Sequence, residues 1–161
     1  GAAGGVGSFA VQLAKWKGAH VTGTASGPNR RFLETLGADE TIDHTRTRFE
    51  DVARDMDVVL DTVGGDTLER SWGVLKRGGI RVSLVEQKKN EEAVRRGVRQ
   101  AGVFAVATAE ELAALAMLVD AGDVKPRVET VFPLAEARQA HRLSQTGHAR
   151  GKIVLRVETA P

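Results

Sequence analysis

The sequence predicts an α/β fold built on a doubly wound parallel sheet in three layers, α/β/α, with helices on both faces of the sheet. Short apolar segments alternate with amphipathic segments along the 161 residues, which is the pattern of strand–helix units. Residues 56–63 carry several apolar residues in succession, as a parallel strand covered on both faces requires. A glycine-rich turn over residues 1–7 leads straight into the first amphipathic segment. These three features together predict a sheet whose strand ends hold a ligand.

Signals at the helix ends support five helices. Ser8 lies near the start of the first helix, and Gly18 ends it. Pro28 suits the first turn of the second helix, with Ser26 or Gly27 as its cap. The expected helices cover residues 8–17, 28–36, 66–76, 109–120 and 133–144.

The expected strands are short segments rich in apolar and β-branched residues, separated by turns. Residues 20–24 are of this kind, and glycine pairs at 64–65 and 78–79 turn the chain. Residues 124–131 alternate like a half-exposed antiparallel or edge strand and are interrupted by Pro126. The expected strands cover residues 20–24, 40–44, 56–63, 80–85, 103–107, 124–131 and 153–157.

Composition excludes several classes of protein. With 42% hydrophobic and 27% charged residues, the chain is typical of a folded globular domain. No apolar run approaches about 18 residues, so we expect no membrane span. The absence of cysteine excludes disulfides and thiolate metal sites and fits a reducing compartment, so a cytoplasmic location is expected. A formal net charge of +2 is too small to indicate binding to nucleic acid or to a membrane.

The stretch from residue 86 to 99 is charged and nearly free of large apolar residues. A solvated surface segment and a nucleic-acid patch are the two interpretations. The stretch has no interleaved aromatic residues on which bases could stack, so the surface segment is favoured and no nucleic-acid partner is expected.

The glycine-rich turn has the spacing A-x-G-x-x-G when it is read from Ala2. Ala2 keeps the turn tight, Gly4 allows the backbone to approach a pyrophosphate, and Gly7 allows the following helix to lie close to the sheet. The helix N-terminus offers unpaired N–H groups and the positive end of its dipole to a diphosphate. A purely structural glycine turn is the alternative. The spacing favours a dinucleotide-binding, Rossmann-type turn.

The end of the second expected strand indicates which dinucleotide is bound. NAD-dependent enzymes usually place Asp or Glu there to accept hydrogen bonds from the ribose, whereas the 2′-phosphate of NADP is repelled by a carboxylate. Residues 24–27 contain no acid, and Arg30 and Arg31 follow in the first turn of a helix, where the dipole disfavours positive charge. Two solvated surface arginines are the alternative. The absent acid and the arginine pair favour NADP over NAD.

A dinucleotide-binding turn normally follows a strand, but this sequence opens inside the turn. We therefore expect a fragment that lacks the first strand of its sheet. That strand is normally central, so its loss leaves two neighbours with unpaired edges, which swapping or dimerisation would fill. A homodimer is expected.

Seven motifs follow one another in the same order as in a known superfamily. Their combination resembles the medium-chain dehydrogenase/reductase superfamily and, within it, the zinc-independent quinone oxidoreductase (zeta-crystallin-like) branch. The resemblance covers nearly the whole chain. The motifs are Gly1-Ala2-Ala3-Gly4-Gly5-Val6-Gly7, Gln12-Leu13-Ala14-Lys15, Leu36-Gly37-Ala38-Asp39, Asp61-Thr62-Val63-Gly64-Gly65, Leu75-Lys76-Arg77-Gly78-Gly79, Val131-Phe132-Pro133-Leu134 and Gly151-Lys152-Ile153-Val154-Leu155.

The resemblance implies a larger enzyme. An N-terminal GroES-like catalytic domain would precede an NADP-binding Rossmann domain, here residues 1–123, and residues 124–161 would return toward the catalytic domain. The implied chemistry is hydride transfer from NADPH to a small-molecule acceptor such as a quinone or an enone. No catalytic residue is assigned here, no metal is expected, and the fragment alone is expected to be inactive. A non-enzymatic nucleotide-binding or structural, crystallin-like module is the alternative, because fold does not determine function.

The resemblance also implies roles for individual residues. Relatives carry a Tyr near the adenosine phosphate where this chain has His44, which could donate a hydrogen bond there or be an ordinary loop histidine. Residues 86–90 replace the small residues that relatives place near the nicotinamide. The implied contacts are Ala2, Gly4, Gly5, Val6 and Gly7 with the pyrophosphate, Ser26, Arg30 and Arg31 with the 2′-phosphate, Val63 and Gly64 with the ribose, and Arg150, Gly151 and Lys152 with the cofactor from the C-terminal segment.

Overall fold

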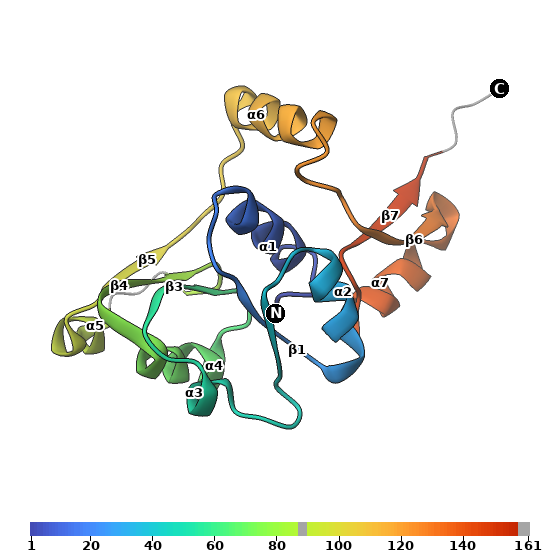
Figure 1. The fold of residues 1–161 in the computed structure, drawn as a ribbon. Coiled ribbons are helices and arrows are strands. Elements are labelled where there is room, and N and C mark those ends of the chain that lie inside the picture. Colours follow the sequence, from blue (N-terminus) through green and yellow to red (C-terminus); the bar gives the residue numbers. More distant parts are fainter. Residues whose placement is uncertain (87–89, 158–161) are drawn as a thin grey trace. The chain divides into compact units, whose positions relative to one another are not determined.

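The structure, a computed structural model, describes residues 1–86 and 90–157 and divides into two compact units. Figure 1 labels their elements in chain order. The expected boundary between residues 123 and 124 separates a cofactor-binding domain from a C-terminal segment. This is a different division of the chain from the two units, and it stays a prediction. The first unit consists of Gly1 and His44–Ala107, and the second consists of Ala2–Asp43 and Thr108–Pro161.

The second unit contains two pairs of parallel strands and their helices. β1 pairs with β2, and β6 pairs with β7. Its elements from the first part of the chain are α1 (Gly7–Trp16), β1 (Thr22–Ala25), the 3-10 helix η1 (Gly27–Asn29), α2 (Arg30–Thr35) and β2 (Glu40–Asp43). Its elements from the last part are α6 (Ala109–Asp120), β6 (Val128–Pro133), the 3-10 helix η3 (Leu134–Glu136), α7 (Ala137–Gln145) and β7 (Lys152–Arg156).

The core of the second unit lies between α1, α2 and β1. Leu33 of α2 is fully buried, and Val11 of α1 and Ala25 of β1 belong to the same cluster. Gly23 of β1 permits this packing, because a Cβ at that position would lie 2.9 Å from a Leu33 methyl carbon. The strand therefore needs glycine where the helix crosses it.

The pair β6–β7 corrects one sequence expectation. Of the two options for residues 124–131, the antiparallel strand is wrong, because β6 runs parallel to β7. α7 connects the two strands and buries Ala140. A helical crossover returns the chain to the same end of the sheet, so that the second strand runs in the direction of the first.

The first unit contains a three-stranded parallel sheet in the order β3-β4-β5. β4 begins earlier than expected, and its Gly79 lies so close to β3 that a Cβ would be 3.0 Å from the Met56 carbonyl oxygen. The elements of this unit are α3 (Phe49–Val52), β3 (Met56–Asp61), α4 (Gly65–Arg70), the 3-10 helix η2 (Ser71–Val74), β4 (Leu75–Ser83), α5 (Glu91–Arg96) and β5 (Arg99–Gly102).

One face of the sheet in the first unit is buried against Trp72. The Arg81 guanidinium lies 3.4 Å from the centre of the Trp72 ring, and both side chains are almost fully buried. Burial lowers the pKa of Arg81, although neighbouring carboxylates oppose the shift. On the other face, Val58 and Leu60 are 58% and 42% exposed.

Among its described residues, the first unit lacks one expected strand and contains one helix that was not expected. Residues 103–107 are not a strand, because β5 ends at Gly102 and the Val103 amide makes the last backbone hydrogen bond to β4, at 2.9 Å from the Ser83 oxygen. The polar stretch over residues 45–55 contains a short helix, α3, which buries Phe49. A single aromatic residue next to acidic residues gives too short a pattern to predict such a helix.

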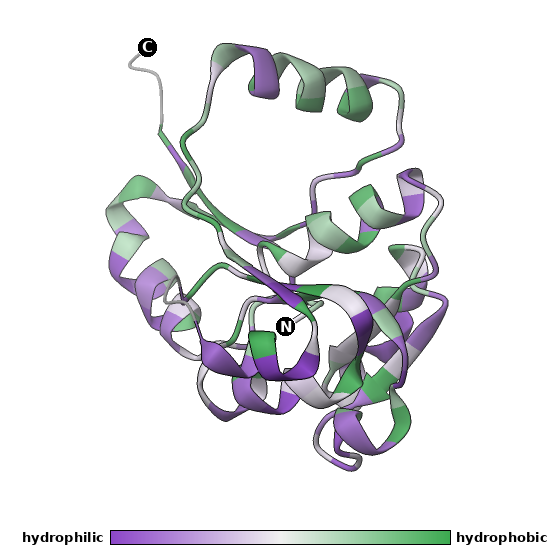
Figure 2. Cartoon of the chain, turned by 90° about the vertical axis from the view of Figure 1, so that its left-hand side faces the viewer, coloured by the Kyte–Doolittle hydropathy of each residue, from purple (hydrophilic) through white to green (hydrophobic). Residues whose placement is uncertain are grey.

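α6 matches its expected bounds, since the Thr108 hydroxyl accepts a hydrogen bond from the Glu111 amide and the Glu111 carboxylate accepts one from the Thr108 amide. No residue of this helix is buried, and Figure 2 shows its apolar residues in green. None of the helices in the described residues has both the length and the apolar character needed to cross a bilayer. The predicted α/β class with parallel sheets is confirmed.

A charged cluster joins α3 to α4 in the first unit. Arg70 Nη1 lies 2.8 Å from one oxygen of the Glu50 carboxylate, and Arg48 pairs with the other at 2.7 Å. The Glu50 side chain is only 14% exposed. Burial opposes its charge, but hydrogen bonds from its own backbone amide and from the two arginines outweigh burial and lower the pKa of Glu50 to about 2.

This cluster predicts an acid-sensitive contribution to stability. The folded-state pKa of Glu50 is lower than the unfolded value, so its contribution is complete above about pH 4.5 and is lost as the pH falls toward about 2. Glu50→Gln should therefore reduce the slope of unfolding free energy against pH in that window. Urea unfolding at several pH values measures the slope, with Glu91→Gln, at an exposed carboxylate, as the control. Equal slopes in wild type and Glu50→Gln would contradict the assignment.

Candidate functional site

Residues 2–7 of the glycine-rich turn lie beside β1 in the second unit and lead into the amino end of α1. The Ala2 amide donates to the Thr24 carbonyl oxygen at 3.1 Å, which fixes the turn against β1. α1 begins at Gly7 with no side-chain cap and no acidic residue in its first turn. Among the described residues, the amides of Gly4, Gly5 and Gly7 have no hydrogen-bond partner. Free amides at a helix N-terminus form an anion-binding site.

The turn at residues 150–152 packs directly against the glycine-rich turn. The Gly151 amide donates to the Ala3 carbonyl oxygen at 3.1 Å. A Cβ on Gly5 would lie 3.1 Å from the Gly151 carbonyl oxygen and 3.2 Å from Lys152 Nζ. The structure therefore brings together two predicted groups of site residues that are almost 150 positions apart in the sequence.

Lys152 brings a positive charge to the free amides. Its ammonium lies near Gly5 and 5.6 Å from the centre of the Phe9 ring, and it forms no ion pair within the described part of the chain. Gly151 has a φ of +81°, and a Cβ there would collide with the Arg127 carbonyl oxygen, so glycine is required for this approach. An ammonium, free amides and a helix dipole together favour a bound phosphate.

The residues predicted to read the 2′-phosphate lie around η1. Arg150 approaches this segment, with Nη2 at 3.5 Å from the Pro28 carbonyl oxygen. The Ser26 hydroxyl accepts a hydrogen bond from the Asn29 side chain at 3.0 Å. Arg30 pairs with Glu34 at 3.0 Å, whereas Arg31 is exposed and has no ion pair among the described residues. Arg31 and Arg150 are therefore the cations with charge available to a ligand.

Asp43 is a carboxylate near this position that the sequence reasoning did not find. It ends β2, and its Oδ2 would lie 2.6 Å from a Cβ on Gly27. The expectation that no acid lies near the ribose was based on residues 24–27 alone, at the end of β1. Parallel pairing of β1 with β2 places Asp43 beside Ala25. The pairing of these two strands was the signal that could have located it.

His44, Val63 and Gly64 belong to the first unit, where two of them lie in one hydrogen-bond network. The buried Asp61 carboxylate accepts from the Gly64 amide at 3.1 Å, from the Val63 amide at 3.3 Å and from the Ser83 hydroxyl at 3.1 Å. Gly64 has a φ of +80°, as a tight turn into α4 requires. His44 is exposed. Of the sequence around the expected nicotinamide position, residues 87–89 lie outside the described residues.

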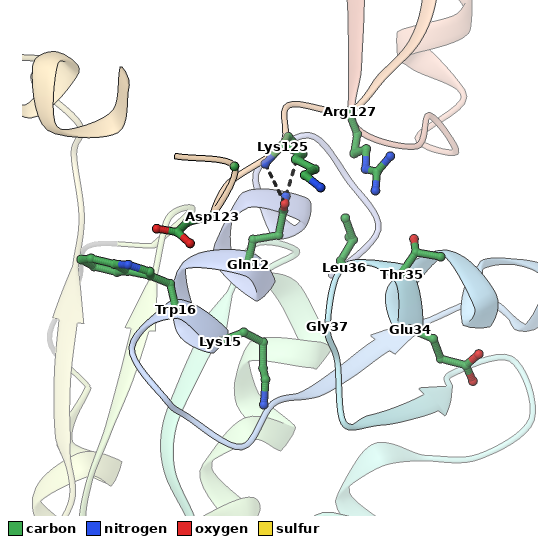
Figure 3. A pocket seen from close by; sticks show the side chains of 11 residues that line it. Gln12, Lys15, Trp16, Glu34, Thr35, Leu36, Gly37, Asp123, Lys125 and Arg127 are labelled. Carbon is green, nitrogen blue, oxygen red and sulfur yellow. Dashed lines mark hydrogen bonds between the residues drawn. The ribbon is translucent and has the colours of Figure 1, made fainter. Parts of the chain in front are cut away.

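A pocket of about 300 Å³ lies in the second unit and is separate from the predicted site (Figure 3). Gln12, Lys125 and Arg127 line part of it, but none of the predicted site residues does. It is broad and open, and Gln12 spans it with hydrogen bonds to the Lys125 backbone. We therefore place the candidate site at the glycine-rich turn. In the parts of the chain that the structure covers, no cluster of three His, Cys, Asp or Glu residues could hold a metal.

Comparison with known proteins identifies the family. The family described as zinc-binding dehydrogenase matches residues 36–155. The chain belongs to this family. It is a member of the medium-chain dehydrogenase/reductase superfamily, as the sequence motifs implied.

Several similar proteins are named as oxidoreductases. A mitochondrial NAD(P)H oxidoreductase of Mus musculus is 36% identical over 184 aligned positions, which cover 98% of this chain and 46% of that protein. A quinone oxidoreductase structure from Coxiella burnetii has a TM-score of 0.89 at 38% identity and covers 98% of this chain and 51% of its own. The structure of Escherichia coli quinone oxidoreductase complexed with NADPH has a TM-score of 0.84 at 28% identity, over 96% and 54% of the two chains.

The proteins similar to this chain therefore include oxidoreductases that use NAD(P)H. The chain spans about half the length of the curated relatives it matches. The predicted cytoplasmic location is wrong, because the similar oxidoreductase from Mus musculus is mitochondrial. The absence of cysteine had suggested a reducing compartment, but it does not distinguish one such compartment from another.

The close approach of Gly5 to Gly151 predicts the effect of a single methyl group. Gly5→Ala should lower the unfolding free energy of the second unit by about 1–3 kcal/mol, because the Gly151 carbonyl oxygen must move. Gly73→Ala is the matched control, since a Cβ there meets nothing within 4 Å. Urea unfolding of both variants measures the difference. Wild-type stability in Gly5→Ala would show that the two turns do not pack as described.

Proposed function

We propose that this chain is the cofactor-binding portion of an NADPH-dependent oxidoreductase that transfers hydride to a quinone, an enone or a similar small-molecule acceptor. The observation that carries the proposal is the position of Lys152 Nζ beside Gly5, at the free amides that precede α1. The quinone oxidoreductases among the similar structures support the class of acceptor. When bound, NADPH would supply the hydride.

The diphosphate of the cofactor fits the glycine-rich turn. Gly4, Gly5 and Gly7 offer amides that have no partner in the described structure, and Ala2 and Val6 complete the turn. Lys152 supplies a cation, and Gly151 lets the two backbones approach. A diphosphate needs hydrogen-bond donors and positive charge, and these residues provide both.

The preference for NADP rests on the charges around η1. Arg31 and Arg150 are available to a 2′-phosphate, and Ser26 and Arg30 are close in sequence. Asp43 opposes the preference, because a carboxylate repels the phosphate and can accept hydrogen bonds from the ribose of NAD. Arg31 and Arg150 can bind a 2′-phosphate, which only NADP offers, so we infer that NADP is preferred.

The remaining roles follow from the same proposal. Val63 and Gly64 would contact the ribose, and His44 would donate a hydrogen bond to the adenosine phosphate. No residue of this chain is assigned to the chemical step, the reaction needs no zinc, and the isolated chain is inactive. The exposed apolar side chains of α6 include Leu112 and Met117. They support a homodimer, because exposed apolar patches often mark protein–protein contacts and a second copy of the chain would bury this one.

Lys152→Ala tests the observation that carries the proposal. The variant should bind NADPH and NADH about tenfold more weakly, because both cofactors have the diphosphate and each loses a charged hydrogen bond. Lys17→Ala, at the other end of α1, should bind both as wild type does. Nicotinamide fluorescence measures the affinities. If wild type binds neither cofactor, or if Lys152→Ala binds both unchanged, the proposed diphosphate site is wrong.

The arginine pair tests the choice of cofactor. Arg30→Ala/Arg31→Ala should weaken NADPH binding by about tenfold or more and leave NADH binding nearly unchanged, since only NADPH has the 2′-phosphate. Arg95→Ala/Arg96→Ala removes an exposed pair on α5 and is the matched control. Side-by-side calorimetric titrations give the ratio of affinities. Equal losses for the two cofactors, or a wild-type preference for NADH, would overturn the assignment.

A further inference from the structure

Gln12 makes an unusual set of contacts for a polar residue on the inner side of a helix. Its side chain is buried, and its Oε1 accepts a hydrogen bond from the Lys125 amide at 2.8 Å. Its Nε2 donates to the Lys125 carbonyl oxygen at 3.2 Å and to the Ser8 carbonyl oxygen at 2.9 Å. Figure 3 shows the two bonds to Lys125. One side chain thus holds both polar backbone groups of a residue 113 positions away.

The contacts of Gln12 continue to the candidate phosphate site. Lys125 is followed by Pro126, whose ring limits backbone rotation, and then by Arg127. The Arg127 carbonyl oxygen accepts a hydrogen bond from the Lys152 amide at 2.7 Å. Gly151 lies against the same carbonyl group and donates its amide to Ala3. Gln12 therefore holds residues 125–127, and these residues contact and stabilise the turn at residues 151–152.

We propose that Gln12 is a positioning residue that holds Lys152 at the glycine-rich turn by fixing the backbone of residues 125–127. This inference rests on the proposed function, because the ligand that Lys152 would meet there is the diphosphate of a dinucleotide. Gln12 itself does not touch the ligand. α1 thus has two roles, since its first turn offers the amides and its second turn fixes the segment that supports the cation.

The hydrogen bonds of Gln12 indicate a specific positioning role for this side chain and not simple packing. The hydrogen bonds of a buried side-chain amide contribute little net free energy to folding. Breaking them, however, is costly, because it leaves backbone N–H and C=O groups unpaired in a partly buried site. Replacing Gln12 by Met keeps the shape of the side chain and removes both bonds to Lys125. The expected consequence is local, because the two lost hydrogen bonds join Gln12 to residue 125.

The first arm of the test needs no ligand. In Gln12→Met, amide hydrogen exchange of Lys125, Gly151 and Lys152 should accelerate about tenfold or more, while Ala25 and Leu36 keep wild-type rates. Gln12→Glu, which keeps the acceptor for the Lys125 amide, should restore part of the protection. Gln145→Met, at the exposed end of α7, is the matched control. Acceleration confined to Lys125, or equal acceleration at all amides, would overturn the proposal.

The second arm measures binding in a double-mutant cycle. Gln12→Met should weaken NADPH binding about as much as Lys152→Ala does, and the double variant should lose little more, because both changes remove the same contact. Losses that simply add would show that Gln12 does not act through Lys152. If wild type binds no dinucleotide, the proposed function fails, and the exchange experiment still decides whether Gln12 positions Lys152.

Discussion

The contact between the glycine-rich turn and the turn at residues 150–152 is the constraint on which the candidate site depends. It requires glycine on both sides, since a Cβ on Gly5 would crowd the Gly151 carbonyl oxygen and a Cβ on Gly151 would collide with Arg127. Neither turn alone offers both donors and charge. The glycine-rich turn has free amides at a helix N-terminus, and Lys152 adds the cation. Their contact therefore brings hydrogen-bond donors and positive charge together at the candidate site.

Local sequence signals predicted much of the fold, because they act over a few residues. Thr108 and Glu111 cap α6 as their spacing indicates, and the turn from Ala2 to Gly7 leads into α1 as expected. The family resemblance implied that Lys152 reaches the cofactor, and the structure has Lys152 beside Gly5 of the glycine-rich turn. Predictions based on local chemistry and on motif order were therefore accurate for most elements.

The features that the sequence did not predict depend on contacts between distant segments. Asp43 lies beside η1 only because β2 pairs with β1 in parallel, and Gln12 meets Lys125 across 113 positions. The strand expected over residues 103–107 is absent because β5 has already ended its pairing with β4 at Gly102. Apolar residues favour a strand over residues 103–107, but hydrogen bonding to a neighbouring strand determines which residues form one. Long-range pairing was the information that the sequence lacked.

The central claim is that a diphosphate binds where the two turns meet. Amide chemical shifts of the ¹⁵N-labelled chain during titration with NADPH, and separately with pyrophosphate, test it residue by residue. The account predicts that both ligands cause their largest shared changes at Gly4, Gly5, Gly7 and Gly151, with matching changes at Lys152. Changes centred on other residues, or none at saturating ligand in a folded chain, would contradict it.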